Sequence, residues 1–116
     1  MDIRKFLRSF VYAFQGIVTA TKEQNMRFHL ASACIVMIAG FLTGLTSIEW
    51  LAIVIVIILV IGAEMINSAI ERVVDLATTE FHPLAKAAKD IAAGAVLVFA
   101  VGSVIIGVLI FFPKWF

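Results

Sequence analysis

The sequence predicts an all-α integral membrane protein, in which an N-terminal amphipathic surface helix precedes three transmembrane helices. Two observations support this fold class. Hydrophobic residues make up 63% of the 116-residue chain and charged residues only 15%, whereas soluble globular chains are about 45–50% apolar. The chain also contains three long apolar segments, separated by short polar ones, that are suited to crossing a bilayer. A chain this short leaves room for one domain, residues 1–116.

Residues 3–20 are predicted to form a helix that lies on the membrane surface. Apolar side chains recur there with the i, i+3, i+4, i+7 spacing of a single helical stripe, which comprises Ile3, Phe6, Leu7, Phe10, Val11, Phe14, Ile17 and Val18. A basic, aromatic-rich helix of this kind lies in the membrane interface and does not cross it. Docking of the same helix on a soluble partner is the alternative.

The first transmembrane span is predicted at about residues 28–46. It contains Gly40 and Gly44 in a G-x-x-x-G spacing, which permits the close approach of another helix. Cys34 lies in the same apolar segment, where a small buried hydrophobic residue is expected.

The other two spans are predicted at about residues 50–76 and 86–112. The second span begins at Trp50, a residue type that is enriched at the membrane interface. Its first half is uncharged, and the helix is expected to continue through the charged residues that follow. A polar break follows, in which Pro83 is well placed to open the next helix. The third span is expected to be closed by Pro113, Lys114 and Trp115.

The basic residues predict the orientation of the chain. In the three-span arrangement eight lysine and arginine residues fall on one side of the membrane, and only Lys114 falls on the other. Because basic residues are concentrated in cytoplasmic loops, the N-terminus is expected in the cytoplasm and the C-terminus outside.

The second span carries acidic residues before it has left the membrane. Glu64, Asn67, Glu71 and Asp75 follow one another at helical spacings and fall within about 80° on one face. A charge near the bilayer centre costs about 2.5–3.5 kcal/mol, and Glu64, the deepest of the four, is the hardest to explain as an ordinary helix end. Asp75 and the neighbouring Arg72 are better explained as interfacial charges, and Glu71 fits either interpretation.

Charged residues of the other two spans lie at the same cytoplasmic interface. Glu23 precedes the first span, and Lys89 and Asp90 lead into the third. Carboxylates from different helices suit Mg²⁺, which takes oxygen ligands and keeps water and substrate phosphates for the rest, and a nearby lysine suits a phosphate. A deeper carboxylate could take a proton from a group lying in the membrane. Together these residues indicate phosphoryl transfer to a lipid hydroxyl.

Two motifs resemble the small prokaryotic membrane diacylglycerol kinase family. They read EMINSAIERVVD (residues 64–75) and HPLAKAAKDIAAGAV (residues 82–96), and the resemblance covers essentially the whole chain. HPLAKAAKD and the C-terminal IIGVLIFFPK are most similar to the Gram-positive branch, whose members favour undecaprenol over diacylglycerol. The resemblance implies a homotrimeric bundle in the inner or plasma membrane of a bacterium, with active sites between protomers, ATP as the phosphoryl donor and Mg²⁺ as the cofactor.

The resemblance also implies a role for each site residue. Glu64 is expected to be the general base that deprotonates the lipid hydroxyl, and so it also contacts the lipid substrate. Glu23 and Glu71 are expected to hold Mg²⁺ against the ATP phosphates. The expected nucleotide-side positions are Lys89, Asp90, Glu80, His82, Asn67, Tyr12 and Lys5.

The predicted function is therefore ATP-dependent phosphorylation of undecaprenol to undecaprenyl phosphate. Diacylglycerol is the alternative acceptor, because residue chemistry does not separate an allylic alcohol from a glycerol hydroxyl. A small proton-coupled transporter built around one membrane glutamate is a remote alternative, and a non-catalytic scaffold would leave the cost of Glu64 unexplained. The seven glycines form neither a P-loop nor a GxGxxG turn, and nothing indicates nucleic-acid binding.

Overall fold

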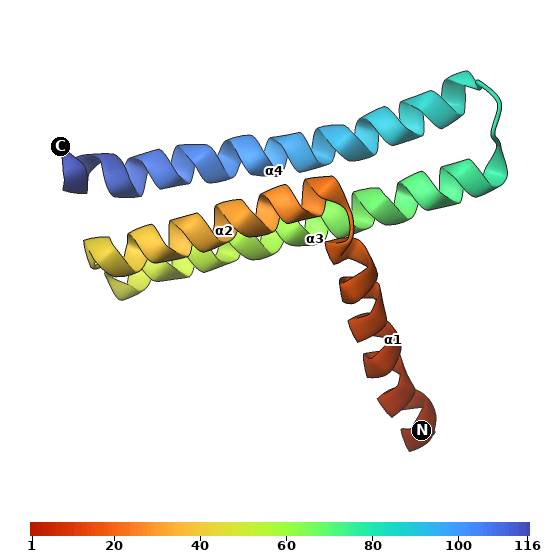
Figure 1. The fold of residues 1–116 in the computed structure, drawn as a ribbon, viewed down its shortest axis with the longest axis horizontal. Coiled ribbons are helices and arrows are strands. Elements are labelled where there is room, and N and C mark those ends of the chain that lie inside the picture. The colour runs from red at the N-terminus through yellow and green to blue at the C-terminus, as the bar shows by residue number, and fades with distance from the viewer.

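Four helices account for nearly the whole chain in the computed structural model, which describes residues 1–116. They are α1 (Ile3–Thr21), α2 (Gln24–Thr43), α3 (Ser47–Ala77) and α4 (Pro83–Trp115). Helices α2, α3 and α4 lie alongside one another as a bundle, and α1 leaves this bundle at a steep angle (Figure 1). The all-α prediction is confirmed, and the three bundle helices are long and apolar enough to cross a membrane.

Helix α1 is joined to the bundle by a short bend. Its N-cap is Asp2, whose carboxylate accepts hydrogen bonds from the backbone N–H groups of Arg4 and Lys5. The helix ends at Lys22, and Glu23 is already the N-cap of α2. Every apolar side chain of the stripe predicted within residues 3–20 is exposed in the single chain, so no other part of the chain covers it.

The turn between α2 and α3 depends on two local signals. Gly44 ends α2 with φ of 79°, a left-handed conformation that glycine adopts without steric cost. Thr46 and Glu49 then form a capping box, in which each side chain accepts a hydrogen bond from the other residue's backbone N–H. For this reason α3 begins at Ser47, three residues before Trp50, where the predicted span starts.

Helix α4 begins at the predicted proline. Pro83 lies in its first turn, where the missing N–H would have no helical partner. The helix continues through Pro113 and ends at Trp115, within the group of residues expected to close the third span. The last turn is held by contacts to the neighbouring helices: the Trp115 indole N–H donates to Thr43 Oγ1 at 2.9 Å, and Lys114 Nζ lies 3.0 Å from Glu49 Oε1.

The single chain buries little of its apolar surface. Only 12 of its 116 residues are buried, and the largest cluster of buried hydrophobic residues is Ile53, Ile110 and Phe111 on α3 and α4. Helix α3 packs against both α2 and α4 and forms the centre of the bundle. Cys34 is exposed, contrary to the expected burial, because its face of α2 is not covered within the chain.

Candidate functional site

Helix α3 carries the candidate site on a face that the chain itself covers. Glu64, Asn67 and Ser68 are each no more than 4% exposed, and they are the buried polar or charged residues of the chain. Further along the helix Glu71 is half-buried and Asp75 is exposed. The predicted polar stripe therefore runs from a buried position at Glu64 to an exposed one at Asp75.

The deepest acidic residue, Glu64, faces a histidine of α2. His29 Nε2 lies 3.6 Å from Glu64 Oε2, and both side chains are largely buried, with 14% and 4% of their surfaces exposed. This separation is longer than a hydrogen bond, and no side chain of the protein donates a hydrogen bond to Glu64. The carboxylate is therefore shielded from bulk water but has free acceptor positions.

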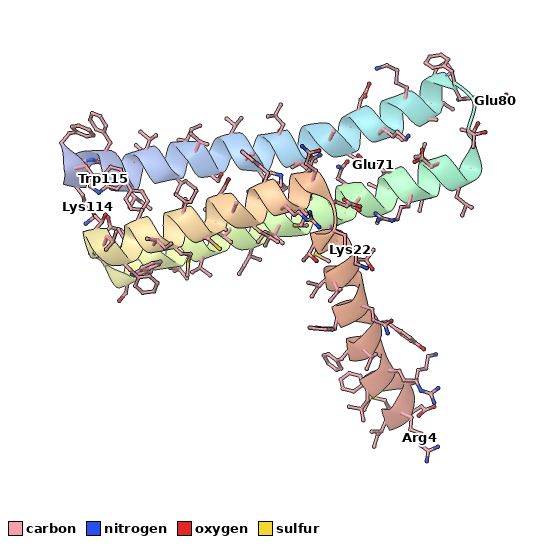
Figure 2. The ribbon with its side chains drawn as sticks, viewed as in Figure 1. Arg4, Lys22, Glu71, Glu80, Lys114 and Trp115 are labelled. Atoms are coloured by element: carbon pink, nitrogen blue, oxygen red, sulfur yellow. The ribbon has the colours of Figure 1, made fainter.

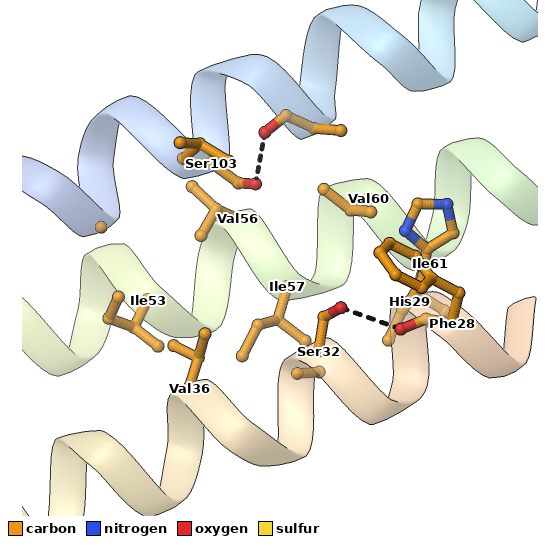
Figure 3. Close-up of a pocket in the computed structure, with 14 residues that line it drawn as sticks. Phe28, His29, Ser32, Val36, Ile53, Val56, Ile57, Val60, Ile61 and Ser103 are labelled. Carbon is orange, nitrogen blue, oxygen red and sulfur yellow. Dashed lines mark hydrogen bonds between the residues drawn. The ribbon is translucent and has the colours of Figure 1, made fainter. Parts of the chain in front are cut away.

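An apolar groove of about 250 Å³ begins at the same histidine. It lies between α2, α3 and α4 (Figure 3), and most of its 14 lining residues are hydrophobic. The two lining serines, Ser32 and Ser103, each donate their hydroxyl to a backbone carbonyl of their own helix, at 2.9 Å and 2.7 Å. Because these hydroxyls are satisfied, His29 is the one polar lining side chain that is not tied to its own helix.

A second set of contacts links the start of α2 to α3. Glu23 Oε1 accepts a hydrogen bond from the Ser68 hydroxyl at 2.5 Å and lies 2.5 Å from Arg72 Nη1. The Ser68 hydroxyl and the Arg72 guanidinium hold the pKa of the Glu23 carboxyl below its ordinary value of 4.5. Glu23 is thus a charged carboxylate at neutral pH, with one oxygen already bound to protein groups.

Asn67 and Glu71 form a third contact, one turn apart on α3. The Asn67 side-chain amide donates to Glu71 Oε1 at 3.2 Å. Asn67 Oδ1 is buried and has no hydrogen-bond partner in the chain. Such an unsatisfied buried oxygen is rare in folded proteins, and Asn67 Oδ1 is free to accept a further hydrogen bond.

The end of the α3–α4 hairpin forms a polar hollow of about 670 Å³. It is lined by the loop and by both flanking helices, and its lining includes Asp75, Glu80, His82, Lys86 and Lys89. Glu80 lies at this end of the molecule, far from Lys114 and Trp115 at the other end (Figure 2). Lys89 Nζ is 2.5 Å from Asp75 Oδ1, and Lys86 is likewise paired with a carboxylate, so both lysines of the hollow already have acidic partners within the chain.

Comparison with known proteins gives the family. The family described as "Prokaryotic diacylglycerol kinase" matches residues 11–111. The chain belongs to the prokaryotic diacylglycerol kinase family. It is 55% identical to an undecaprenol kinase of Bacillus subtilis, over 97% of this chain and 93% of that protein. It is also 39% identical to a diacylglycerol kinase of Synechocystis, over 92% of this chain and 62% of that protein, and 38% identical to one of Helicobacter pylori, over 82% and 75%.

Membership of the diacylglycerol kinase family confirms the prediction of an ATP-dependent lipid kinase. It also confirms that the motifs at residues 64–75 and 82–96 were assigned to the right family. A membrane kinase of this family is consistent with three apolar helices, and a proton-coupled transporter is no longer needed to explain a glutamate within a span.

The chain brings together some of the predicted site residues of this kinase but not all of them. Asn67 contacts Glu71, and Glu80, His82 and Lys89 share the hollow at the hairpin end. Asp90 instead lies 2.5 Å from Lys86 Nζ, on an exposed face of α4. Two further positions, on α1, make no side-chain hydrogen bond or ion pair with the bundle: Lys5 and Tyr12.

The donors for a divalent cation are of the right chemical type, although they do not converge in one chain. No group of three or more histidine, cysteine, aspartate and glutamate side chains lies together. Glu71 and the unsatisfied Oδ1 of Asn67 are oxygen donors on one face of α3. Because Mg²⁺ is usually bound by one or two carboxylates plus substrate phosphates, the oxygen atoms of these residues and of Glu23 are of the type that Mg²⁺ takes.

Sequence analysis did not assign a role to three residues that contact the site. They are His29, which faces Glu64, and Ser68 and Arg72, which bind Glu23. From the sequence alone, Arg72 is better explained as an interfacial charge. Ser68 follows Glu64 by four residues, a spacing that places both on one helix face, but the partners on α2 are not visible in the sequence.

Proposed function

We propose that the chain transfers the γ-phosphoryl group of ATP to the hydroxyl of undecaprenol, giving undecaprenyl phosphate and ADP. The identity to the Bacillus subtilis undecaprenol kinase is well above the identity to the diacylglycerol kinases compared. A polyprenol has a long hydrocarbon chain and a single terminal hydroxyl. The acceptor site must therefore hold the hydrocarbon chain in the membrane and place the terminal hydroxyl beside a base.

One observation carries this proposal: Glu64 is a buried carboxylate whose partner His29 opens on an apolar groove. The groove runs from Phe28 and Ile61 to Val36 and Ile53, about eight residues or ~12 Å along the helices. It suits the first part of a hydrocarbon chain, whose hydroxyl would then meet the buried acid. We infer that the groove holds the acceptor lipid with its chain directed into the membrane.

In the proposed reaction the hydroxyl oxygen attacks the γ-phosphorus while Glu64 takes the hydroxyl proton. The bond between the γ-phosphorus and the β–γ bridging oxygen breaks, and ADP leaves with that oxygen. General-base assistance of this kind contributes about 10²–10⁴-fold to the rate. Glu64 suits the task because few donors compete for its carboxylate.

We assign the nucleotide to the polar side of Glu64. Glu71, Glu23 and Asn67 would hold Mg²⁺, which supplies charge neutralisation at the phosphates when bound. Lys89, with His82 and Glu80, lines the hollow at the hairpin end, and its ammonium suits a phosphate. The remaining nucleotide-side candidates are Asp90, Tyr12 and Lys5.

We also propose that the enzyme works as a homotrimer in a bacterial plasma membrane, with its N-terminus in the cytoplasm. The exposed apolar residues of the bundle and of α1 support burial in lipid and against further copies. The cation donors that do not converge in one chain support a site completed by a neighbouring protomer. The amphipathic α1 would lie in the cytoplasmic interface.

A competition assay tests the acceptor. The purified protein in mixed micelles receives undecaprenol and diacylglycerol at equal concentration, together with Mg²⁺ and ATP labelled in the γ-phosphate. We expect most of the label in undecaprenyl phosphate, and about 10²–10⁴-fold slower labelling by the Glu64→Gln variant purified in parallel. A large excess of labelled phosphatidic acid would overturn the choice of acceptor, and absence of label from both lipids would overturn the kinase assignment.

A further inference from the structure

Glu64 has few ways to keep its carboxylate charged and oriented. It is 3% exposed, and an isolated carboxylate in a weakly polar environment is costly unless donors bind it. The only ionisable side chain within ion-pair distance is His29, on a different helix. The orientation of the proposed base therefore depends on one imidazole.

The position of His29 is suited to this task. Its Nε2 lies 3.6 Å from Glu64 Oε2, slightly longer than a direct hydrogen bond, and hydrogen bonds between catalytic groups are often long before substrate binds. The same ring lines the groove, whereas Glu64 is not one of the lining residues, so His29 is the residue that connects the groove with Glu64. A small movement of either side chain would close the gap.

We propose that His29 is a positioning residue of the kinase: its Nε2–H donates to one oxygen of Glu64 and leaves the other oxygen free for the hydroxyl of the acceptor. This inference rests on the proposed function, because it assumes that Glu64 is the base. It adds a residue of α2 to a site so far built mainly from α3, and it links the lipid groove to the proton acceptor.

A packing role for His29 is the competing explanation. The ring contacts Phe28 edge-on, with centroids 5.9 Å apart, and it fills part of the groove wall. An aromatic ring without an N–H would serve packing equally well. The positioning role therefore requires an N–H donor at position 29, whereas the packing role requires only the volume of the ring.

Three variants make this separation. His29→Gln keeps an N–H donor near the position of Nε2, His29→Phe keeps the ring volume without the donor, and His29→Ala removes both. For the Phe and Ala variants we expect kcat to fall by about 10- to 100-fold, the range for losing a hydrogen bond to a charged group, while KM for ATP is unchanged. The Gln variant should recover most of the lost rate. A Phe variant as active as the wild type, or a Gln variant as slow as Ala, would overturn the proposal.

A double-mutant cycle keeps the test decisive if the Ala variant is unstable. If His29 acts through Glu64, His29→Phe will have little further effect on the residual rate of Glu64→Gln, because the interaction is already lost. Equal factors in both backgrounds would overturn the positioning role. Failure of the proposed function gives a different result. If Glu64 is not the base, Glu64→Gln keeps its full rate whatever residue occupies position 29, and if the protein is not a lipid kinase, the wild type itself transfers no label.

Discussion

The carboxylate of Glu23, at the start of α2, lies 2.5 Å from the guanidinium of Arg72 on α3. The contact fixes the point at which α1 and α2 meet the central helix. It also occupies one oxygen of a residue that we assign to the metal. Glu23 would therefore bind the metal through its other oxygen, or Arg72 would move away when the metal and nucleotide bind. The stability of this junction is open to a simple test.

The first prediction concerns pH. The pKa of Glu23 is held below its ordinary value of 4.5 by the Ser68 hydroxyl and by Arg72. The folded state therefore favours the charged carboxylate, and the resulting stability is present above pH 4.5 and is lost as the pH falls through the lower folded pKa. The loss should be about 1 kcal/mol or less, because the pair is partly solvated. Thermal unfolding in detergent at falling pH measures it.

Glu23→Gln is the matched variant for this experiment. It keeps the shape of the side chain but carries no titrating group, so its Tm should fall less than that of the wild type below pH 4.5. Asp2→Asn, at the far end of α1, serves as the control for general acid effects. Parallel pH profiles for the wild type and Glu23→Gln would contradict the prediction.

The second prediction concerns the base. Glu64→Gln is nearly isosteric, so the protein should remain folded and keep its oligomeric state while kcat falls by about 10²–10⁴-fold. Transfer of label from ATP in detergent–lipid micelles measures the rate, and size-exclusion chromatography measures the assembly. Glu49→Gln is the matched control, because it lies at the opposite end of the bundle and glutamine retains the capping box. Near-normal turnover by the Glu64 variant would remove the base from the mechanism.

The third prediction concerns the close approach of α2 and α3. A Cβ added to the buried Gly40 would lie 2.7 Å from Trp50 Cη2 and 3.1 Å from Leu45 Cδ1. Gly40→Ala should therefore destabilise the protein by about 1–3 kcal/mol through overpacking, despite the better helix propensity of alanine.

Gly16→Ala is the control for this substitution. Nothing lies within 4 Å of its added Cβ, so only the propensity term of up to about 1 kcal/mol remains, and this term is favourable. Denaturation in detergent compares the two variants. Equal stability of Gly40→Ala and the wild type would show that the Trp50 ring moves at no cost.

Local signals in the sequence determined the helices and indicated the candidate site. Long apolar segments predict three spans, Pro83 marks the start of α4, and the acidic residues at helical spacing on α3 begin at a buried position. These features depend on residues close together in the chain, for which hydrophobic periodicity and terminus preferences are informative. A local rule does not predict the contacts that Lys114 and Trp115 make with other helices.

The tertiary structure alone decided which residues of different helices meet. His29 and Glu64 are 35 residues apart in sequence, and Glu23 and Arg72 are separated by 49, so no spacing rule predicts either contact. Both pairs arise because α2 runs antiparallel to α3 and brings its first turns beside the polar half of that helix. The sequence places each charge at its position along a helix, and the packing of the helices selects its partner.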